Sequence, residues 1–299
     1  MSDSHAHDAN GTDEGSHGAT REGPGPSDAD ESGDASDAVP SASVDDSPAA
    51  GLDDGDAALD DPTYHGARAA AYGVAAAAFL YPDEPTLSEL RAPETVEGLS
   101  AAADRLGGPV AAAAEDLLAA LERVDGDALR GAHTDLFGVP DDGGTYPVAP
   151  YETAYTVAGG GDHEQRRIAA VAGLLEAFDL DRGEDFDERH DHVAVELELM
   201  QVLAAKRAVA LDADESDLAA TMRDAEATVV EGHLAEFVPS LSADLRDALD
   251  DRGADDGAAA LLCAAATLAE RLVERDAATH PSDVPTPDSV AAAPGGELP

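Results

Sequence analysis

The densest group of side chains that could do chemistry lies in ERHDHVAVELE, residues 188–198. His192 and Glu196 are four residues apart, which places both on one face of a helix, as metal ligands can be. Asp191 or His190 would then be a third ligand. In the alternative interpretation, Asp191 caps the start of this helix and Glu196 pairs with a basic side chain. One interpretation of the segment is therefore that the protein is a metal-dependent helical enzyme that uses Asp191, His192 and Glu196.

A second unusual segment is PVAPYETAYTV, residues 147–157, which holds two prolines, two tyrosines and one acidic residue. It overlaps a Gly/Pro-rich loop, residues 138–150, which begins where a predicted helix ends in Leu136 and Phe137. Such a segment is a rigid corner between helices closed by aromatic packing, or one wall of an apolar groove. We interpret it as both, because a corner of this kind can turn the chain and still line a binding surface.

Two other candidate sites are weak. VAGGGDHE, residues 157–164, has the glycines of a phosphate-binding loop, but a Walker loop needs Gly-Lys-Ser/Thr and the only lysine is Lys206. We interpret it as a glycine linker. The single cysteine, Cys263, lies in an apolar helical segment and allows no internal disulfide, so we expect it to be buried and structural.

The composition limits the partners and the compartment. The net charge is −47, from 64 acidic residues against 17 basic ones. Such a surface stays hydrated in molar salt, and it argues against nucleic acid as a partner because phosphate contacts need Lys and Arg. The N-terminus shows neither the basic nor the apolar region of a secretory signal, and the longest weakly polar run, residues 69–81, is shorter than the about 20 residues that span a bilayer. We expect a soluble, cytoplasmic protein without stable membrane insertion.

The elements that must position these residues are predicted to be helices. Residues 1–61 and 279–299 are acidic or Pro-rich and lack aromatic side chains, so we expect disordered tails around a domain at 62–278. No alternating β-branched run occurs, and the predicted fold is all-α, a single-domain bundle of about ten helices. The helical pattern covers 63–80, 93–106, 109–124, 125–137, 163–178, 191–211, 216–238, 242–253 and 254–278.

Three segments, taken in order, carry a resemblance. A helix that ends in Leu-Phe and a Gly/Pro-rich loop lead into Pro-Tyr-Glu-Thr-x-Tyr at 150–155. Asp-His-Val-Ala-x-Glu-Leu-Glu-x-Met follows at 191–200, and His-Leu-Ala-x-Phe-x-Pro at 233–239. Over residues 62–275 the chain resembles the TorD/DmsD/NarJ family of redox-enzyme maturation chaperones, in a haloarchaeal form.

The resemblance implies an all-helical TorD-like domain without catalytic residues and without a cofactor of its own. A protein of this family binds the N-terminal twin-arginine signal peptide of a molybdopterin oxidoreductase of the DMSO reductase type, and holds the apoenzyme in the cytoplasm until its cofactor is inserted. The chain departs from the family pattern at Arg189, where Pro is frequent, and at Phe237, where Trp is frequent, so the shape of the groove is expected to differ. The residues implied at the signal-peptide surface are Leu136, Phe137, Pro150, Tyr151, Glu152, Tyr155, Asp191 and His192.

A twin-arginine signal has a basic start and an apolar middle, so its binding site needs an apolar trough with acid at one end. Phe137, Tyr151 and Tyr155 would supply the trough, and Glu152 and Asp191 would accept hydrogen bonds from guanidinium groups. In molar salt the apolar contacts should dominate, so Ala at Phe137 or Tyr151 is expected to cost more binding than Gln at Glu152.

Several questions stay open at this point. The chaperone interpretation predicts no stoichiometric metal, whereas the enzyme interpretation requires one. A helical assembly or regulatory protein without any signal-peptide role is a further alternative. The client reductase is not identified by the sequence, and the chain could be a monomer or a helix-swapped dimer.

Overall fold

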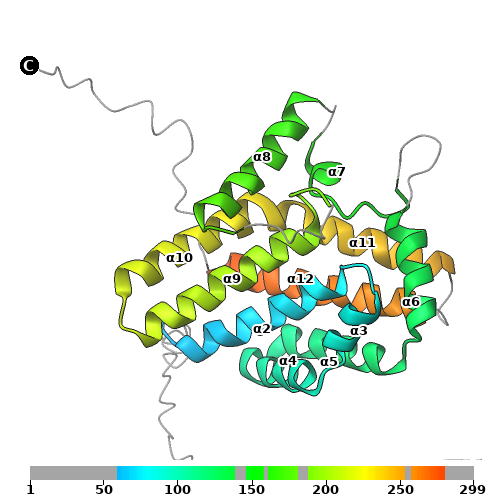
Figure 1. The fold of residues 1–299 in the computed structure, drawn as a ribbon, viewed down its shortest axis with the longest axis horizontal. Helices are drawn as coiled ribbons and strands as arrows, with labels where there is room; N and C mark the ends of the chain where they lie inside the picture. The colour runs from blue at the N-terminus through cyan, green and yellow to red at the C-terminus, as the bar shows by residue number, and fades with distance from the viewer. Residues whose placement is uncertain (1–58, 139–145, 158–160, 181–187, 253–256, 280–299) are drawn as a thin grey trace, which may run out of the picture. The chain divides into compact units, whose positions relative to one another are not determined.

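The computed structural model describes residues 59–138, 146–157, 161–180, 188–252 and 257–279, and the regular elements within them are helices joined by short turns (Figure 1). The predicted all-α fold is confirmed, and in these ranges the one β feature is an isolated antiparallel bridge between Tyr151 and His192. Residues 1–58 and 280–299, nearly the whole of both predicted tails, lie outside the described residues, so the division into domain and tails stays a prediction. The helices are α2 Pro62–Ala78, α3 Glu84–Leu90, α4 Pro93–Leu106, α5 Gly108–Arg123, α6 Gly126–His133, α7 Thr153–Thr156, α8 Asp162–Ala177, α9 Val193–Asp212, α10 Ser216–Val229, α11 Ala235–Arg252 and α12 Gly257–Thr279, with π-helical turns η1 Thr134–Gly138 and η2 Val230–Leu234.

Aspartate caps and early prolines start the N-terminal helices. Asp61 accepts a hydrogen bond from the Thr63 N–H at the start of α2, and Asp125 accepts from two N–H groups at the start of α6. These caps satisfy donors that an α-helix leaves free in its first turn. Between α4 and α5 the chain turns through Gly107 and Gly108, whose φ angles of +65° and +56° disfavour any residue with a Cβ.

The helix predicted to end before Pro239 continues through it. α10, η2 and α11 run without interruption, and Pro239 lies inside α11. A proline inside a helix removes one hydrogen bond and clashes with the preceding turn, and here the π-helical turn η2 ends at Leu234, just before α11. The predicted boundary was therefore wrong, and the insertion also gives His233 and Leu234 positions that a regular helix would not.

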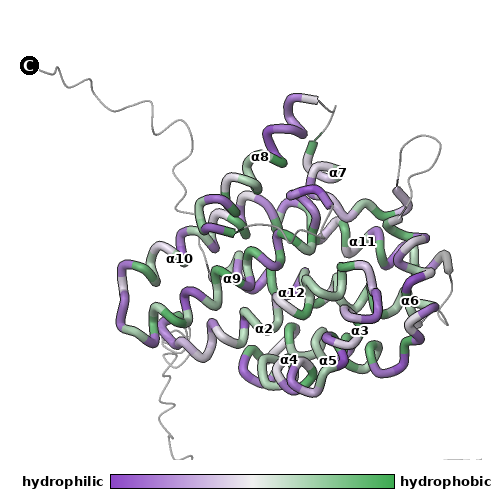
Figure 2. The backbone as a smooth tube through the Cα atoms, in the orientation of Figure 1, coloured by the Kyte–Doolittle hydropathy of each residue, from purple (hydrophilic) through white to green (hydrophobic). Residues whose placement is uncertain are grey.

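Three helices, α2, α9 and α12, form the centre of the helical pack. α2 lies against α9, α4 and α12, while α12 also packs on α5 and α11 (Figure 1). Figure 2 shows apolar stretches along the central helices and polar residues on their outer turns. Small residues allow close approach of α2 and α9: a Cβ added to Gly73 would lie 2.8 Å from the Gln201 side chain. The largest fully buried side chains are Arg68, Tyr72, Phe79, Phe237, Leu99, Leu117, Leu129, Leu197, Leu199, Met200, Leu203 and Leu234.

A buried ion-pair cluster ties the central helices together. Arg68 of α2 binds Asp276 of α12 at 2.6 Å and Glu226 of α10 at 3.0 Å. Arg207 of α9 binds the same Glu226 at 2.9 Å, and the Tyr72 hydroxyl donates to Asp276 at 2.8 Å. Because all these groups are buried, removing one partner would leave an uncompensated charge in the core.

Two sequence expectations concern single features of the helices. Cys263 is buried, as expected, and its thiol lies 3.0 Å from the Leu245 carbonyl oxygen. Burial raises the pKa of this thiol to about 11, which keeps it protonated and unreactive. Among the helices that the structure describes, none has the length and apolar character to cross a membrane.

Candidate functional site

The segment 150–153 docks against the start of α9. The Glu152 N–H donates to the Asp191 carbonyl at 2.9 Å, and the Val193 N–H donates to the Pro150 carbonyl at 2.9 Å. Two stretches about 40 residues apart in sequence therefore meet by backbone pairing. The structure brings together the predicted residues Pro150, Tyr151, Glu152, Asp191 and His192.

The helix cap at this junction is His192 and not Asp191. His192 Nδ1 accepts from the Ala194 N–H at 3.1 Å, so the ring serves as the N-cap of α9. Burial lowers the pKa of His192 to about 4. Asp191 instead binds the neighbouring segment, accepting from the Thr153 hydroxyl at 2.8 Å.

Both predicted arginine acceptors already bind guanidinium groups of this chain. Asp191 accepts from Arg189 at 2.7 Å, and Glu152 accepts from Arg167 Nε at 2.6 Å. The two carboxylates are buried, whereas the side chains of Arg189 and Arg167 are 39% and 24% exposed. Arg167 also donates to Glu236 at 2.7 Å. The expectation that the acids bind guanidinium fits their chemistry, and the structure supplies internal partners that the sequence did not reveal.

The rings predicted to line an open trough are packed inside. Phe137 is 6% exposed and lies 6.3 Å from Phe79 and 5.0 Å from His133, measured between ring centroids. Tyr151 is 9% exposed and stacks edge-on against His192 at 5.5 Å. The expectation that Phe137 and Tyr151 present open faces is wrong in this conformation. The physical reason is that a chain with 11 aromatic residues and no Trp uses these rings to fill its core.

The other predicted contact residues lie in the same neighbourhood. Leu136 is buried in the hydrophobic core, and Pro150 is buried beside the α9 start. Tyr155 is half-buried, stacks on Phe237 at 6.2 Å and donates to Asp244 at 3.0 Å. Arg189, which stands where proline is frequent in the family, lies 4.6 Å from the centre of the Tyr151 ring.

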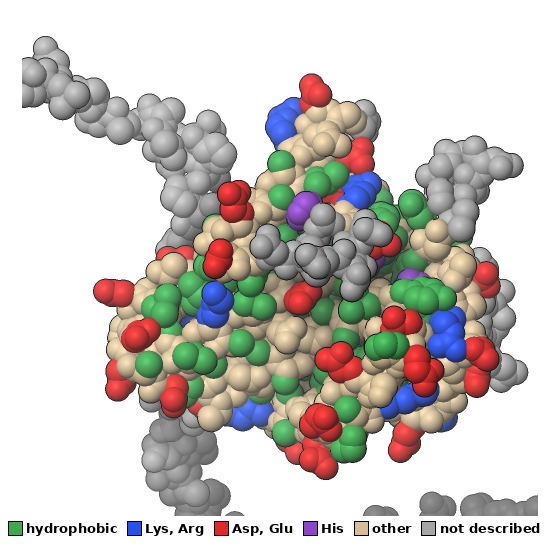
Figure 3. Space-filling view, in the orientation of Figure 1, with side chains coloured by type: hydrophobic (Ala, Val, Ile, Leu, Met, Phe, Trp, Pro, Cys, Tyr) green, Lys and Arg blue, Asp and Glu red, His purple; other side chains and the backbone are tan. Residues whose placement is uncertain are grey.

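A groove of about 440 Å³ runs beside the α9 start, between α2, α3, α4 and α9. It ends at Ala194, the residue whose N–H His192 caps. Figure 3 shows hydrophobic side chains interspersed with acidic ones on the face that carries α2, α4 and α9. The apolar lining comes from Ala70, Gly73, Val74, Ala76, Ala77, Leu80, Leu90, Gly98 and Leu99, and exposed Glu89, Glu94 and Glu198 form an acidic rim.

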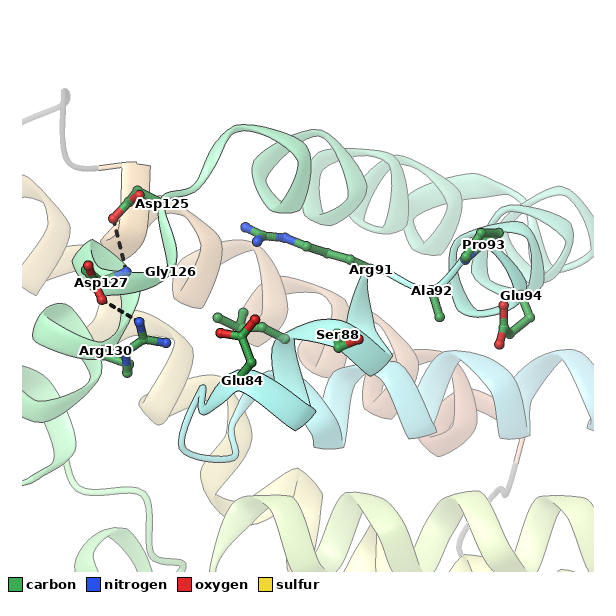
Figure 4. A pocket seen from close by; sticks show the side chains of 11 residues that line it. Glu84, Ser88, Arg91, Ala92, Pro93, Glu94, Asp125, Gly126, Asp127 and Arg130 are labelled. Atoms are coloured by element: carbon green, nitrogen blue, oxygen red, sulfur yellow. Dashed lines mark hydrogen bonds and ion pairs between the residues drawn. The ribbon is translucent and has the colours of Figure 1, made fainter.

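A larger pocket of about 670 Å³ lies between α3, the start of α4 and the start of α6 (Figure 4). Its charged side chains already have partners: Arg91 donates to the Val124 carbonyl at 2.6 Å, and Arg130 donates to Pro82 O at 3.1 Å and binds Asp127. The pocket is therefore a helix junction whose arginines are already engaged by other groups of the chain.

The predicted metal set does not form as expected. Glu196 is buried, and the group of possible ligands to which it belongs contains Glu152 and His233 in place of Asp191 and His192. Sequence reasoning missed His233 and Arg167 as site residues. His233 belongs to the motif at 233–239, but its contact with Glu152 arises from the position of η2 beside segment 150–153, which the sequence does not encode locally.

The family model described as nitrate reductase delta subunit matches residues 103–243. The predicted resemblance to the NarJ/TorD-type chaperone family is therefore confirmed over this range. The matched range contains the α9 start, segment 150–157 and η2, so the docked junction lies inside the family region. No curated protein and no solved structure matches the chain. Members of this family are chaperones of molybdoenzyme maturation and not catalysts.

Proposed function

We propose that this NarJ/TorD-type chaperone binds the twin-arginine signal peptide of a molybdopterin oxidoreductase of the DMSO reductase type, and holds the apoenzyme in the cytoplasm until the cofactor is inserted. The observation that carries the proposal is the groove between α2, α4 and α9, whose lining is in part apolar, with Thr95 and Gln201 among its polar residues and three glutamates on its rim. This is the complement of a peptide with a basic start and an apolar middle.

The apolar part of the signal occupies the groove. Burying apolar surface stabilises a complex by about 25 cal/mol per Å², so a few hundred Å² give several kcal/mol before ordering costs. Molar salt screens exposed ion pairs and leaves apolar burial intact. In a chain of net charge −47, this term therefore dominates affinity.

The arginine side chains of the signal peptide replace arginine side chains of the chaperone as partners of two buried carboxylates. Glu152 and Asp191 are shaped to hold guanidinium groups, and they hold Arg167 and Arg189 in the free protein. Both internal arginines are partly exposed, so they can swing out while the acids stay in place. Helix α8, which carries Arg167 and stands out from the other helices in Figure 1, buries only Val171 and Leu175, so its displacement costs little.

The remaining residues of the predicted surface are buried and support the site without contacting the peptide. Phe137, Leu136 and Tyr151 fix the loop and the helix end against which the acids are placed, and His192 caps α9 where the groove ends. In this proposal their substitution weakens binding through the fold of the site, and not through lost contact with the peptide.

Calorimetry of the full chain in molar KCl with two synthetic signal peptides tests the proposal. One peptide carries the Arg-Arg pair and the other carries Lys-Lys at the same positions. Lysine lacks the planar fork that matches a carboxylate, so the arginine peptide should bind at least about tenfold more tightly. Equal affinity of the two peptides would refute guanidinium recognition, and no binding of either would refute the signal-peptide function.

A variant of the chaperone separates exchange from simple attraction. Arg189→Gln removes an internal competitor for Asp191 and leaves an uncharged, shorter polar side chain. If the signal displaces Arg189, affinity for the arginine peptide should rise by roughly threefold or more, because the binding-competent state no longer competes with a closed one. Arg223→Gln is the matched control, since Arg223 is an exposed arginine on α10 with an Asp224 partner of its own. A fall in affinity for Arg189→Gln would show that Arg189 does not compete with the peptide.

A further inference from the structure

A buried trio of possible metal ligands lies beside the docked junction. Glu152 precedes α7, Glu196 lies in the first turn of α9, and His233 lies in η2. One ligand atom of each residue lies within 4.8 Å of those of the other two, and all three residues are buried. Three elements that are distant in sequence thus converge on one point.

Glu196 is the residue that requires an explanation. Neither of its carboxylate oxygens has a hydrogen-bond partner in the part of the chain that the structure describes, and its exposure is 1%. An ionised carboxylate buried without a partner is strongly unfavourable, so it must hold a proton or a cation. Burial, and then the charges of Glu152 and Asp191, raise the pKa of Glu196 well above its ordinary value.

The charges around the trio favour a divalent cation over a single proton. Arg167 is bound by Glu152 and by Glu236, so its one positive charge is shared between two carboxylates. With Glu196, three carboxylates surround one guanidinium, which leaves two negative charges. One divalent ion balances them, whereas one proton leaves a negative charge in place.

The geometry also suits a metal ion. His233 Nδ1 lies 3.1 Å from both carboxylate oxygens of Glu152. Two ligands of a tetrahedral zinc ion, each about 2.0–2.1 Å from the metal, lie roughly 3.3 Å from each other. The Glu152–His233 pair is therefore already spaced like one edge of such a site, and a rotation of the Glu196 side chain closes it. The π-helical turn that places His233 is a local distortion of the kind often found at functional sites.

We propose that Glu152, Glu196 and His233 bind one divalent cation of the zinc class. Two carboxylates and one imidazole suit Zn²⁺, whereas Mg²⁺ and Ca²⁺ prefer sites made of oxygen ligands alone. The ion joins segment 150–153, α9 and η2, and so fixes the acid cluster that the start of α9 presents. This inference stands on the trio itself and does not depend on the signal-peptide function, and it departs from the expectation, drawn from the resemblance, that the protein binds no stoichiometric metal.

Titration of chelator-treated full-length protein with Zn²⁺ in molar KCl tests the site, with thermal unfolding as a second readout. The wild type should bind one Zn²⁺ per chain and unfold at a higher temperature with the ion, because a ligand that binds only the folded state stabilises it. Glu196→Gln should lower the affinity by at least about tenfold, as loss of one metal ligand does, and should abolish the thermal shift. Glu198→Gln, an exposed glutamate two residues further on the same helix, is the matched control and should behave as the wild type.

Two results would overturn the site. The first is a wild type that binds no Zn²⁺. The second is Zn²⁺ binding that Glu196→Gln and His233→Gln leave unchanged, which would place the ion elsewhere, for example on the histidines of residues 5–17. Visible absorption of bound Co²⁺ gives an independent check, since a band typical of low coordination should appear in the wild type and in Glu198→Gln but not in Glu196→Gln.

Discussion

Acidification should destabilise the protein through one buried histidine of α2. His65 is fully buried, its Nε2 lies 2.9 Å from the Leu59 carbonyl, and its Nδ1 lies 2.8 Å from Arg68 Nη1. A guanidinium only donates hydrogen bonds, so Nδ1 must be the acceptor and the ring must be neutral with its proton on Nε2. Protonating Nδ1 would break this bond and place a positive charge against Arg68.

The size of the effect follows from the pKa. Burial, together with the charges of Arg207 and Arg68, lowers the pKa of His65 from 6.5 to about 4. In the unfolded chain this histidine takes up its proton near pH 6.5, and in the folded protein only near pH 4. The stabilising contribution is therefore complete above pH 6.5 and is lost as the pH falls toward 4. Each pH unit in this window costs about 1.4 kcal/mol, and the whole window about 3 kcal/mol.

The assay is denaturant unfolding of the wild type and of His65→Gln at several pH values between 6.5 and 5. Gln removes the titrating group, so the variant's unfolding free energy should fall less steeply with decreasing pH, by about 1.4 kcal/mol per unit. Comparing slopes makes the result independent of any constant stability loss from the substitution itself. Parallel curves for the two proteins would refute the assigned tautomer and its link to Arg68.

Further predictions concern the core and the junction. Phe137→Ala should lower the unfolding free energy by about 3–5 kcal/mol, because it removes a buried ring; denaturant unfolding measures this, and a loss below about 1 kcal/mol would show that the ring is not a core residue. The folded fraction of Phe137→Ala should still bind the signal peptide within about threefold of the wild type, as expected of a residue without direct contact. A hundredfold loss of affinity in calorimetry would instead show that the Phe137 ring contacts the peptide. Asp276→Asn should destabilise by about 3–5 kcal/mol, since it leaves the buried Arg68 and Arg207 with one carboxylate, Glu226, between them; retention of wild-type stability in the same assay would contradict the importance of the Arg68–Asp276 pair.

Local sequence patterns predicted the elements well because the signals are themselves local. Asp61 and Asp125 with the prolines that follow many helix starts fix where helices begin, and Gly107 with Gly108 fixes where α4 ends. The helix end predicted at Pro239 was wrong because proline usually ends or kinks a helix, whereas α11 continues through it. The apolar periodicity predicts that helices form, but it does not predict which helices pack against each other.

The sequence predicted which residues lie at the site better than it predicted their contacts. Asp191, His192 and segment 150–155 are indeed adjacent, which the order of motifs could suggest but not show. The predicted solvent exposure of Phe137 and Tyr151 was wrong, because the sequence around an aromatic residue near a loop is the same whether its ring faces solvent or the core. The partners Arg167 and His233 were missed because their contacts with Glu152 join positions 15 and 81 residues apart.

The groove is the central claim, and filling it tests that claim most directly. Gly98 lines the groove on α4, and Gly66 is exposed on α2 away from it; a Cβ added at either position meets nothing within 4 Å. Leucine at either position should be tolerated by the helix, because glycine is the weaker helix former. In calorimetry with the arginine signal peptide, Gly98→Leu should bind at least about tenfold more weakly than the wild type, because the added side chain fills the groove. Gly66→Leu should bind like the wild type. Undiminished binding by Gly98→Leu would contradict the account.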